Sequence, residues 1–255
     1  MIYETDTKYF KFKKSNDWVN LNLYTKISYY KTVLTKYYAP YVDKITAKQI
    51  VKDLCGDKIK VANIIKILNG PYDIIVQDLN PGHIIKSSHG SGWNINITSA
   101  TNLSTSKKLL NDWNKLYSSI HNEEQYKYIT PRFFIEEKID DKIHGKNGIA
   151  DLYAIRCIHG KPTTININRL GKYNKYDINF NYLETPQFNL DIPYNEIDRM
   201  IELSKILSNP FEFVRIDFYL DKNSDIYFSE FTFTPNAGYQ FYPMDVEAAL
   251  GALWI

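Results

Sequence analysis

The alternation of apolar and polar residues is clearest between residues 213 and 238, where it predicts two strands joined by a polar turn. On the first strand, apolar residues at even positions alternate with Arg215, Asp217 and Tyr219. Residues 221–225 supply the turn formers, and a second aromatic-rich strand follows. Because successive side chains point to opposite faces of a strand, the charged residues of each strand are expected to share one face.

Two carboxylates are expected to meet across this hairpin. A turn that is symmetrical about residues 223–224 places Asp217 opposite Glu230. It also places Arg215 opposite Thr232. Facing residues have Cβ atoms roughly 5 Å apart, so two carboxylates repel each other unless a cation lies between them. Oxygen ligands of this kind suit Mg²⁺, which they bind at about 2.1 Å. The pattern therefore predicts a magnesium site, and a solvated strand face with ion pairs to Arg215 is the alternative.

The second strand of the hairpin is expected to divide its side chains between two faces by the same alternation. One face takes Phe228, Glu230 and Thr232, and the other takes Tyr227, Ser229, Phe231 and Phe233. This division assumes one register along the whole hairpin, and a slip of one residue would exchange the two faces.

Apolar residues at a spacing of three or four predict helices in four places. These are the aromatic-rich stretch 21–40, which Pro40 is expected to end, and residues 43–56, 104–119 and 193–209. Asp43 is expected to cap the start of the second helix, and Gly56 is expected to close it. Ser104 or Ser106 is the expected cap of the third.

Short strands or buried elements are predicted between the helices. They cover residues 61–68, 72–79, 83–87, 93–97 and 131–140, and residues 150–168 form two strands around a His-Gly-Lys-Pro turn. Residues 170–190 show no clear period and are expected to form an extended loop that faces the acceptor substrate.

The hairpin at residues 83–97 has a tip rich in serine and glycine. Gly90 and Gly92 allow the backbone to approach phosphate oxygens closely, while Lys86 supplies a fixed positive charge. The tip lacks the Gly-Lys-Ser/Thr end of a Walker A loop, and it is not a dinucleotide fingerprint. A flexible tip that folds over phosphates is one interpretation, and an ordinary turn is the other.

Composition narrows the class of protein. The chain has 255 residues, of which 44% are hydrophobic, enough to build one or two cores. With 31 basic and 29 acidic residues, its charge of +2 gives no strong case for nucleic acid or an anionic membrane as the main partner. Cys55 and Cys157 have no motif partner and are expected to be reduced core residues. No apolar run approaches the roughly 20 residues of a membrane span, and the N-terminus is too polar for a signal peptide, so a cytoplasmic protein is expected.

Two segments near the C-terminus carry a family resemblance. RIDFY at 215–219 and IYFSEFTFTPNAG at 226–238 resemble the metal-binding strands of ATP-grasp ligases, most closely the TupA-like branch, which takes part in teichuronopeptide biosynthesis. The resemblance covers residues 40–245 and includes the order of the motifs. It implies an α+β ATP-grasp fold with two α+β subdomains that sandwich ATP, preceded by a small N-terminal segment. The implied segments are residues 1–79, 80–138 and 139–255.

The resemblance also implies roles for individual residues. The ligands of two Mg²⁺ ions match Asp217, Glu230 and Thr232. The groups that stabilise the transferring phosphate match Arg215, Arg169 and Lys86, with Arg156 as a further basic candidate. The nucleotide contacts match Lys44, Lys86, Ser87, Ser88, His89, Gly90, Ser91, Gly92, Glu136, Glu137, Ile139 and Asp151.

Within the nucleotide contacts, Lys86 and residues 87–92 match the lid over the phosphates. Glu136, Glu137 and the backbone near Ile139 match the segment that binds adenine, and the carboxylate of Asp151 matches the ligand of the ribose hydroxyls. Several of these assignments have alternatives. Lys48 is the alternative to Lys44, His89 is either a phosphate ligand or a polar turn residue, and Thr232 stands where ATP-grasp enzymes generally have Asn.

By this resemblance, the protein is expected to use ATP and Mg²⁺ to form an amide from a carboxylate and an amine through an acyl phosphate. The expected partners are small-molecule acids and amines, with a glycan or nucleotide-sugar acceptor, because the TupA-like branch attaches amino acids or peptides to surface polysaccharide. Two alternatives stay open. One is a phosphotransferase on the same fold, and the other is a catalytically inactive carbohydrate-binding scaffold.

Overall fold

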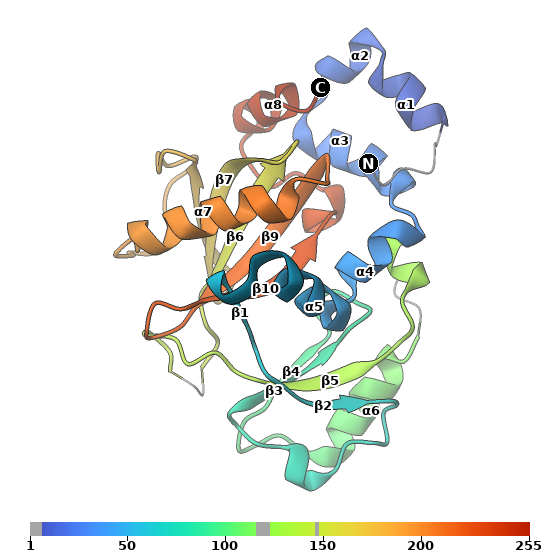
Figure 1. Cartoon of the computed structure of the whole chain (residues 1–255), viewed down its shortest axis with the longest axis vertical. Helices are drawn as coiled ribbons and strands as arrows, with labels where there is room; N and C mark the ends of the chain where they lie inside the picture. The colour runs from blue at the N-terminus through green and yellow to red at the C-terminus, as the bar shows by residue number, and fades with distance from the viewer. Residues whose placement is uncertain (1–6, 116–122, 146–147) are drawn as a thin grey trace.

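The computed structural model describes residues 7–115, 123–145 and 148–255, which form a mixed α+β structure with two sheets (Figure 1). The larger sheet has six strands, in the order β1 (Lys60–Val61), β10 (Ile226–Thr232), β9 (Phe213–Leu220), β6 (Leu152–Ile158), β7 (Lys161–Arg169) and β8 (Lys172–Asp177). The smaller sheet has four strands, in the order β2 (Ile64–Leu68), β5 (Phe133–Glu137), β3 (His83–Ser87) and β4 (Asn94–Asn96). Apart from β1, which runs parallel to β10, all neighbouring strands are antiparallel.

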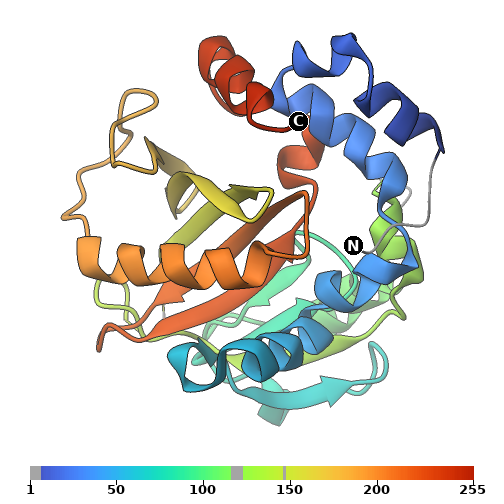
Figure 2. The ribbon, with the colours of Figure 1, turned by 45° about the horizontal axis from the view of Figure 1, so that its top comes forward.

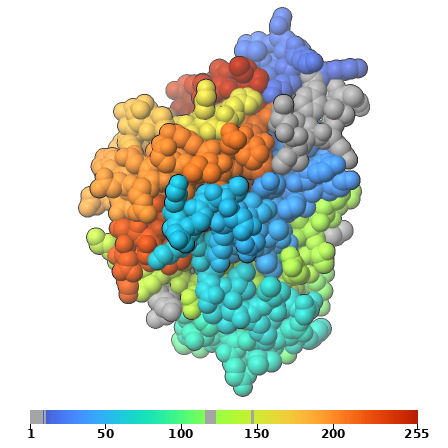
Figure 3. Space-filling model, in the orientation of Figure 1, coloured from blue at the N-terminus to red at the C-terminus, as the bar shows by residue number. Residues whose placement is uncertain are grey.

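Helices cover one face of each sheet and lie between the sheets. Helix α7 (Tyr194–Ser208) crosses one face of the larger sheet, as Figure 2 shows, and α6 (Leu103–Trp113) packs on the smaller one. Helix α5 (Lys44–Cys55) lies between the orange α7 and the teal lobe of the smaller sheet (Figure 3). The remaining α-helices are α1 (Thr7–Lys13), α2 (Asn16–Val19), α3 (Leu23–Tyr30), α4 (Ala39–Val42) and α8 (Met244–Ala252). Short 3₁₀ helices are η1 (Lys31–Val33), η2 (Lys36–Tyr38), η3 (Gly56–Lys58), η4 (Val76–Asp78), η5 (Glu124–Tyr128) and η6 (Pro235–Gly238).

The hairpin of β9 and β10 pairs Asp217 with Glu230 as predicted, but it contains a bulge that was not predicted. Asp217 faces Glu230, whereas Phe218 faces Phe228, so the register shifts by one residue at Ser229. The shift returns Phe228 to the core face, where its ring lies 4.8 Å from that of Phe231. The expectation that Phe228 shares a face with Glu230 is therefore wrong, because it assumed an unbroken strand.

Several local predictions are confirmed. The Asp43 carboxylate caps α5 by accepting hydrogen bonds from the backbone N–H groups of Ile45 and Thr46, and the helix ends at Gly56. The turn between β6 and β7 falls where the His-Gly-Lys-Pro string predicted it, with positive φ at His159 and Gly160. Both cysteines are buried and unpaired.

Other local predictions are wrong for identifiable reasons. Pro40 does not end a helix but lies in the first turn of α4, where its missing N–H costs no hydrogen bond. Helix α6 is capped by Asn102, not by Ser104 or Ser106. It ends at Trp113 and not at residue 119 as predicted, and residues 116–119 lie outside the described residues. Residues 170–190 were expected to form a loop, but residues 172–177 form the edge strand β8. The prediction missed this strand because its polar sequence shows no apolar alternation.

The two apolar segments before β3 are less buried than expected. Residues 72–79 form turns and η4, with Tyr72 and Val76 exposed and Ile74 buried. Strand β2 lies at the edge of the smaller sheet, which leaves Ile65 and Ile67 half-exposed. Strand β2 falls in the segment 1–79 yet pairs with β5, and the three-segment division stays a prediction.

The N-terminal helices are tied to the C-terminus. The Lys26 ammonium donates to the carbonyls of Gly251 and Trp254 at 2.8 and 2.7 Å, and it is fully buried. The Trp18 ring packs edge-on against Trp254, and its Nε1–H donates to the Trp254 carbonyl. Helices α3 and α8 lie side by side in Figure 2. Across the described residues, no helix is both long and apolar enough to cross a bilayer.

We expect Gly251→Ala to lower the free energy of unfolding by about 1–3 kcal/mol, because a Cβ there would lie 2.2 Å from the carbonyl oxygen of Leu21. The control is Gly70→Ala, since a Cβ at Gly70 meets nothing within 4 Å. Urea denaturation measures both. Equal stabilities for the two variants would contradict the close packing of α8 against the N-terminal segment.

Candidate functional site

A buried carboxylate between two lysines lies where the two sheets approach each other. Glu136 on β5 forms an ion pair with Lys86 on β3 at 2.5 Å and with Lys48 on α5. All three side chains are buried. The register between β3 and β5 explains the first pair, because Glu136 faces Ile84, the residue two before Lys86 on the same face. The second pair joins Glu136 to a residue outside the sheet, Lys48 of helix α5.

The charges of this cluster support one another. Burial alone would raise the pKa of Glu136, but Lys86 and Lys48 outweigh it and hold that pKa below its ordinary value. Burial alone would lower the pKa of Lys86, but the attraction of Glu136 outweighs it, and the pKa is raised. For Lys48 burial prevails, and its pKa is lowered. Glu136 is therefore ionised at neutral pH and fixes the positions of both lysines.

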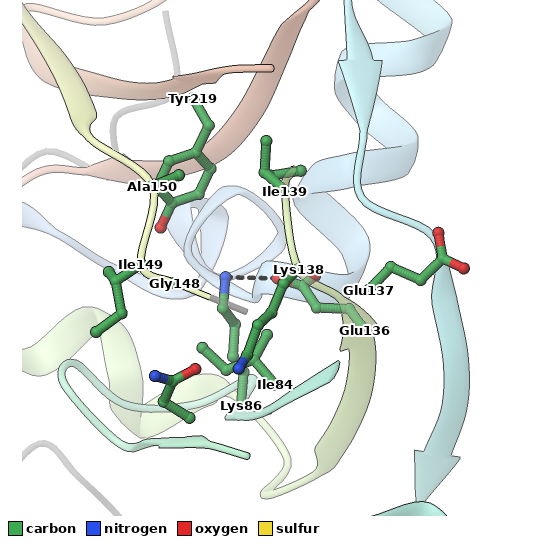
Figure 4. A pocket seen from close by; sticks show the side chains of 11 residues that line it. Ile84, Lys86, Glu136, Glu137, Lys138, Ile139, Gly148, Ile149, Ala150 and Tyr219 are labelled. Atoms are coloured by element: carbon green, nitrogen blue, oxygen red, sulfur yellow. Dashed lines mark ion pairs between the residues drawn. The ribbon is translucent and has the colours of Figure 1, made fainter. Parts of the chain in front are cut away.

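A small cavity opens beside this cluster, between residues of the two sheets (Figure 4). It holds about 50 Å³ and is lined by Ile84, Lys86, Asn96, Glu136, Glu137, Lys138, Ile139, Gly148, Ile149, Ala150 and Tyr219. Tyr219 on β9 of the larger sheet points toward the ammonium of Lys86, which lies 5.7 Å from the ring centroid. The Glu137 carboxylate points away from Lys86, so this residue lines the cavity without joining the ion pairs.

Lys44 joins the same helix to the larger sheet. Its ammonium donates to the carbonyl of Gly90 at 2.6 Å and lies 3.2 Å from Glu230. Lys48 follows four residues later, so both lysines share one face of α5. The helix therefore directs Lys44 to the larger sheet and Lys48 to the smaller one. Both of the lysines that the sequence offered as alternatives lie at the candidate site.

The predicted carboxylate pair lies on the face of the larger sheet that Lys44 contacts. Asp217 is fully buried and binds Arg215 through two hydrogen bonds of 2.7 and 2.6 Å. Arg215 also donates to the Thr232 hydroxyl at 3.1 Å and lies 4.0 Å from Glu230. Burial, reinforced by the nearby Glu230, raises the pKa of Asp217 despite Arg215. Lys44 and Arg215 outweigh burial at Glu230 and lower its pKa.

The donor set of this pair fits a hard divalent cation. Asp217 and Glu230 face each other across β9 and β10, and their oxygens are the type of ligand that Mg²⁺ prefers. Burial is the main cause of the raised pKa of Asp217, and a cation between the carboxylates would offset this burial and the smaller repulsion of Glu230. Thr232 adds a hydroxyl, whose oxygen here accepts from Arg215.

The serine-glycine tip is largely buried. Ser87 and Ser88 are fully buried, and the carbonyl of Gly90 accepts a hydrogen bond from Lys44, whereas Ser91 and Gly92 are exposed. The flexible tip over the phosphates stays a prediction, and only residues 91–92 of it are exposed.

His89 is a structural residue in this tip. The backbone N–H of Arg132 donates to its Nδ1, so the ring proton lies on Nε2, which donates to the carbonyl of Trp113 at 2.9 Å. Ser87 also hydrogen-bonds Nδ1. Burial lowers the pKa of His89. With both nitrogens engaged inside the protein, this arrangement supports a packing role and not the predicted contact with phosphate.

Asp151 and Arg169 bind each other. The Arg169 guanidinium donates to both oxygens of Asp151 at 2.7–3.1 Å and also to the carbonyl of Asn189. Asp151 lies beside Asp141 and His144, whose ligand atoms are within 4.8 Å of one another and of its own. In the part of the chain that the structure describes, their hydrogen bonds and ion pairs do not reach the Lys86 or Asp217 clusters. The predicted ribose and γ-phosphate roles stay predictions.

Among the lining residues that sequence reasoning missed, three have polar groups in their side chains. Tyr219 lies two residues after Asp217, so the alternation of β9 was a signal that both share a face. Asn96 was noted only as a polar position in the returning strand, although its side-chain oxygen is buried without a partner among the described residues. Lys138 gave no signal in the sequence, because it follows the end of β5 and belongs to no alternating pattern. In the structure its ammonium donates to the carbonyl of Ile97.

The clusters together suit a polyanion that carries a divalent cation. Four cationic groups, from Lys44, Lys48, Lys86 and Arg215, lie among three carboxylates, from Glu136, Asp217 and Glu230. The carboxylates supply oxygen ligands for a metal, and the cationic groups supply donors for phosphate oxygens. Residues from both sheets and from α5 contribute.

Comparisons with known proteins agree on the fold. A family model described as TupA-like ATPgrasp matches residues 23–255. Similar solved structures include an ADP complex of N5-carboxyaminoimidazole ribonucleotide synthetase, with 11% identity, a TM-score of 0.50, and coverage of 76% of this chain and 45% of that one. An L-amino acid ligase from Bacillus licheniformis has 13% identity, a TM-score of 0.50, and coverage of 80% and 45%. A D-alanine–D-alanine ligase from Bacillus anthracis has 16% identity, a TM-score of 0.50, and coverage of 82% and 61%.

These likenesses confirm the predicted ATP-grasp fold. The chain spans about half of the length of the first two solved structures and about three fifths of the third. A search of curated proteins gives no match.

We expect Glu136→Gln to destabilise the protein by about 3–5 kcal/mol at pH 7, because it leaves two buried lysines without a counter-charge. Glu137→Gln is the matched control, and it is expected to change stability by less than about 0.5 kcal/mol. Because the pKa of Glu136 is held below 4.5, its stabilising charge is present above that pH and is lost as the pH falls through the lowered value. In urea denaturation, the difference in unfolding free energy between the wild type and Glu136→Gln should therefore become smaller at acidic pH. A difference that does not change with pH, or no difference at all, would contradict this role of Glu136.

Proposed function

Because the chain belongs to the TupA-like ATP-grasp family, we propose that it is an ATP- and Mg²⁺-dependent ligase that joins a carboxylate to an amine. One observation supports this most strongly: Lys44 on α5 lies 3.2 Å from Glu230 of the carboxylate pair, one helical turn from Lys48, which pairs with Glu136. Groups suited to phosphate and groups suited to a metal are thus held by one helix. That combination is what a metal-bound nucleoside triphosphate requires.

The residues divide the work of the proposed reaction by their charge. Asp217, Glu230 and Thr232 would hold Mg²⁺, which neutralises phosphate charge when bound. We assign two ions to this set. Lys86, Lys48 and Lys44 bind phosphate oxygens of ATP.

The proposed reaction has two steps. A substrate carboxylate oxygen attacks the γ-phosphorus, the bond to the β,γ-bridging oxygen breaks, and ADP leaves with an acyl phosphate as the other product. Arg215 stabilises the charge on the transferring group, because its guanidinium lies between Asp217 and Thr232 beside the carboxylate pair. An amine then attacks the acyl carbon, phosphate leaves with the electron pair of the C–O bond, and the amine loses a proton.

Nucleotide binding requires the sheets to separate. The cavity beside Lys86 holds about 50 Å³, whereas pockets for small ligands hold roughly 300–1,000 Å³. The Lys86–Glu136 pair and Tyr219 fill this space. ATP would enter between β5 and β9, with Glu136, Glu137 and Ile139 along the adenine and Asp151 at the ribose. Ser91 and Gly92, the exposed part of the tip, are the segment best placed to close over it.

Two similar solved structures support a substrate class for the proposed ligase. One similar solved structure is an L-amino acid ligase and another is a D-alanine–D-alanine ligase, both of which join amino acids. We propose that this chain attaches an amino acid or peptide to a sugar or surface polysaccharide, with a glycan or nucleotide sugar as acceptor.

We expect Asp217→Asn and Glu230→Gln each to lower Mg²⁺-dependent release of ADP by about 100-fold or more, because each removes a charged oxygen ligand. Asp225→Asn is the control, since Asp225 lies in the turn of the same hairpin and pairs with Lys60 outside the site. Circular dichroism confirms that each variant is folded. Wild-type turnover in both site variants would overturn the metal assignment.

Product analysis tests the reaction itself. Amino acids and sugar acids are screened with amines for release of ADP, and the products are identified by mass spectrometry. An amide formed with ADP and phosphate is expected. A stable phosphoester without phosphate release would identify a phosphotransferase, and no turnover with any acid would favour a binding scaffold.

A further inference from the structure

Arg156 is a buried arginine that the proposed reaction does not use. It lies on β6, directly opposite Arg215 on β9, and its side chain is 2% exposed. Facing residues on neighbouring strands have Cβ atoms roughly 5 Å apart, so two guanidinium groups lie side by side on the polar face of the larger sheet. Two like charges at this distance repel each other unless each has a counter-charge.

Two of the three side-chain nitrogens of Arg156 carry hydrogen-bond donors that are not satisfied, although the side chain also hydrogen-bonds that of Tyr242. Within residues 7–115, 123–145 and 148–255, its Nε and Nη1 atoms have no hydrogen-bond partner, although both are buried. The guanidinium carbon lies 4.5 Å from the ring centroids of both Phe241 and Tyr242. An aromatic face attracts the charge but offers no lone pair, so these rings do not replace acceptors for the N–H groups. A buried donor without an acceptor costs about 1–3 kcal/mol, so an arginine held this way calls for an explanation.

The nearby carboxylates are engaged elsewhere. Both oxygens of Asp217 bind Arg215. Glu247 accepts from the backbone N–H groups of Phe241 and Tyr242 with one oxygen and from that of Tyr24 with the other. Arg215 therefore pairs directly with a carboxylate, whereas in the described part of the chain no ion pair or hydrogen bond joins Arg156 to either of these two groups. Burial, together with the repulsion of Arg215, lowers the pKa of Arg156.

Phe241 forms the cover of this position. Its ring lies between Arg156 and the ammonium of Lys175, which is 3.9 Å from the ring centroid and donates to the Phe241 carbonyl at 2.5 Å. Phe241 is only half-buried, and the two residues before it, Tyr239 and Gln240, are exposed. Tyr242 covers Arg156 as well but is fully buried, so Phe241 is the ring whose outward rotation would let a ligand reach Arg156.

We propose that Arg156 binds a second anionic group of the acid substrate, so that the substrate is a dianion with two carboxylates a few ångströms apart. This inference rests on the proposed function, in which Arg215 stabilises the phosphoryl group as it is transferred to the carboxylate that reacts. Arg156 faces the one that does not. A guanidinium binds a carboxylate through two parallel hydrogen bonds, and Nε and Nη1 are the free donors on one side of the fork. The site therefore selects acids by their second charge.

Calorimetry with simple probes tests this. The full chain is loaded with Mg²⁺ and a non-hydrolysable ATP analogue, and malonate, succinate and glutarate are each titrated against their half-amides, which keep the length and lose one charge. In the wild type, at least one dicarboxylate is expected to bind roughly tenfold or more tightly than its half-amide. In Arg156→Met this ratio is expected to fall to within about twofold, with the affinity for the ATP analogue unchanged. Arg199→Met, on the exposed surface of α7, is the matched control and should keep the wild-type ratio.

Each outcome separates this inference from the proposed function. Absence of analogue binding by the wild type would overturn the proposed function. Analogue binding with no preference for any dicarboxylate, or a preference that survives in Arg156→Met, would overturn the role of Arg156. If circular dichroism shows that Arg156→Met is unfolded, Arg156→Lys decides the matter, because lysine keeps the charge and loses the two-point fork. An undiminished ratio in Arg156→Lys then counts against the proposal.

Discussion

The buried ion pairs of Glu136 with Lys48 and Lys86 are the constraint on which the relation of the two sheets depends. A charge removed from water must have a partner, so each member of this cluster fixes the position of the others. Lys86 and Glu136 belong to the smaller sheet, and Lys48 belongs to α5, whose Lys44 contacts Glu230 on the larger sheet. A helix that serves both sheets cannot shift without breaking one of these contacts. The fold and the candidate site therefore share the same interactions.

The polar face of the larger sheet is tolerated because its charges are paired, Asp217 with Arg215 on the same strand and Glu230 with Lys44 of α5. Helix α7 covers the apolar face, where residues such as Ile216 and Phe218 are fully buried. The opposite face carries Asp217 and Arg215 next to each other, in a position that an isolated charge would not occupy. The bulge at Ser229 keeps both arrangements compatible, because it returns Phe228 to the core while Glu230 stays opposite Asp217.

The sequence predicted the site to the extent that its signals were local. Alternation on β9 and the capping of α5 by Asp43 depend on neighbouring residues, and both were read correctly. The facing of Asp217 and Glu230 was also predicted, but from a symmetrical turn that the structure does not have; the bulge happens to restore that pairing. What failed was decided at long range. His89 looked like a residue of a mobile tip, yet Trp113 and Arg132 bury it through contacts that no local pattern reveals.

The same distinction explains the strands that were misjudged. Strand β8 has a polar sequence and exists because it pairs with β7, so its own pattern held no signal. The choice between Lys44 and Lys48 had no answer in the sequence for a similar reason. Helical spacing places both on one face of α5, but which charge each one meets depends on how two sheets pack around that helix.

The charge pairing inside the protein also limits what nucleotide binding costs. Lys44 and Arg215 already lie against Glu230 and Asp217, so these charges are held in place before any ligand arrives. A nucleotide and its metal bring anionic and cationic groups together, which lets the lysines take phosphate oxygens while the carboxylates take the metal. The site then exchanges one set of ion pairs for another, and no charge has to be buried alone at any stage. Arg156 departs from this rule, since its buried Nε and Nη1 atoms have no acceptor to exchange. Buried donors without an acceptor gain the most from an anionic ligand, and for this reason Arg156 carries more information about the substrate than the ion-paired residues around it.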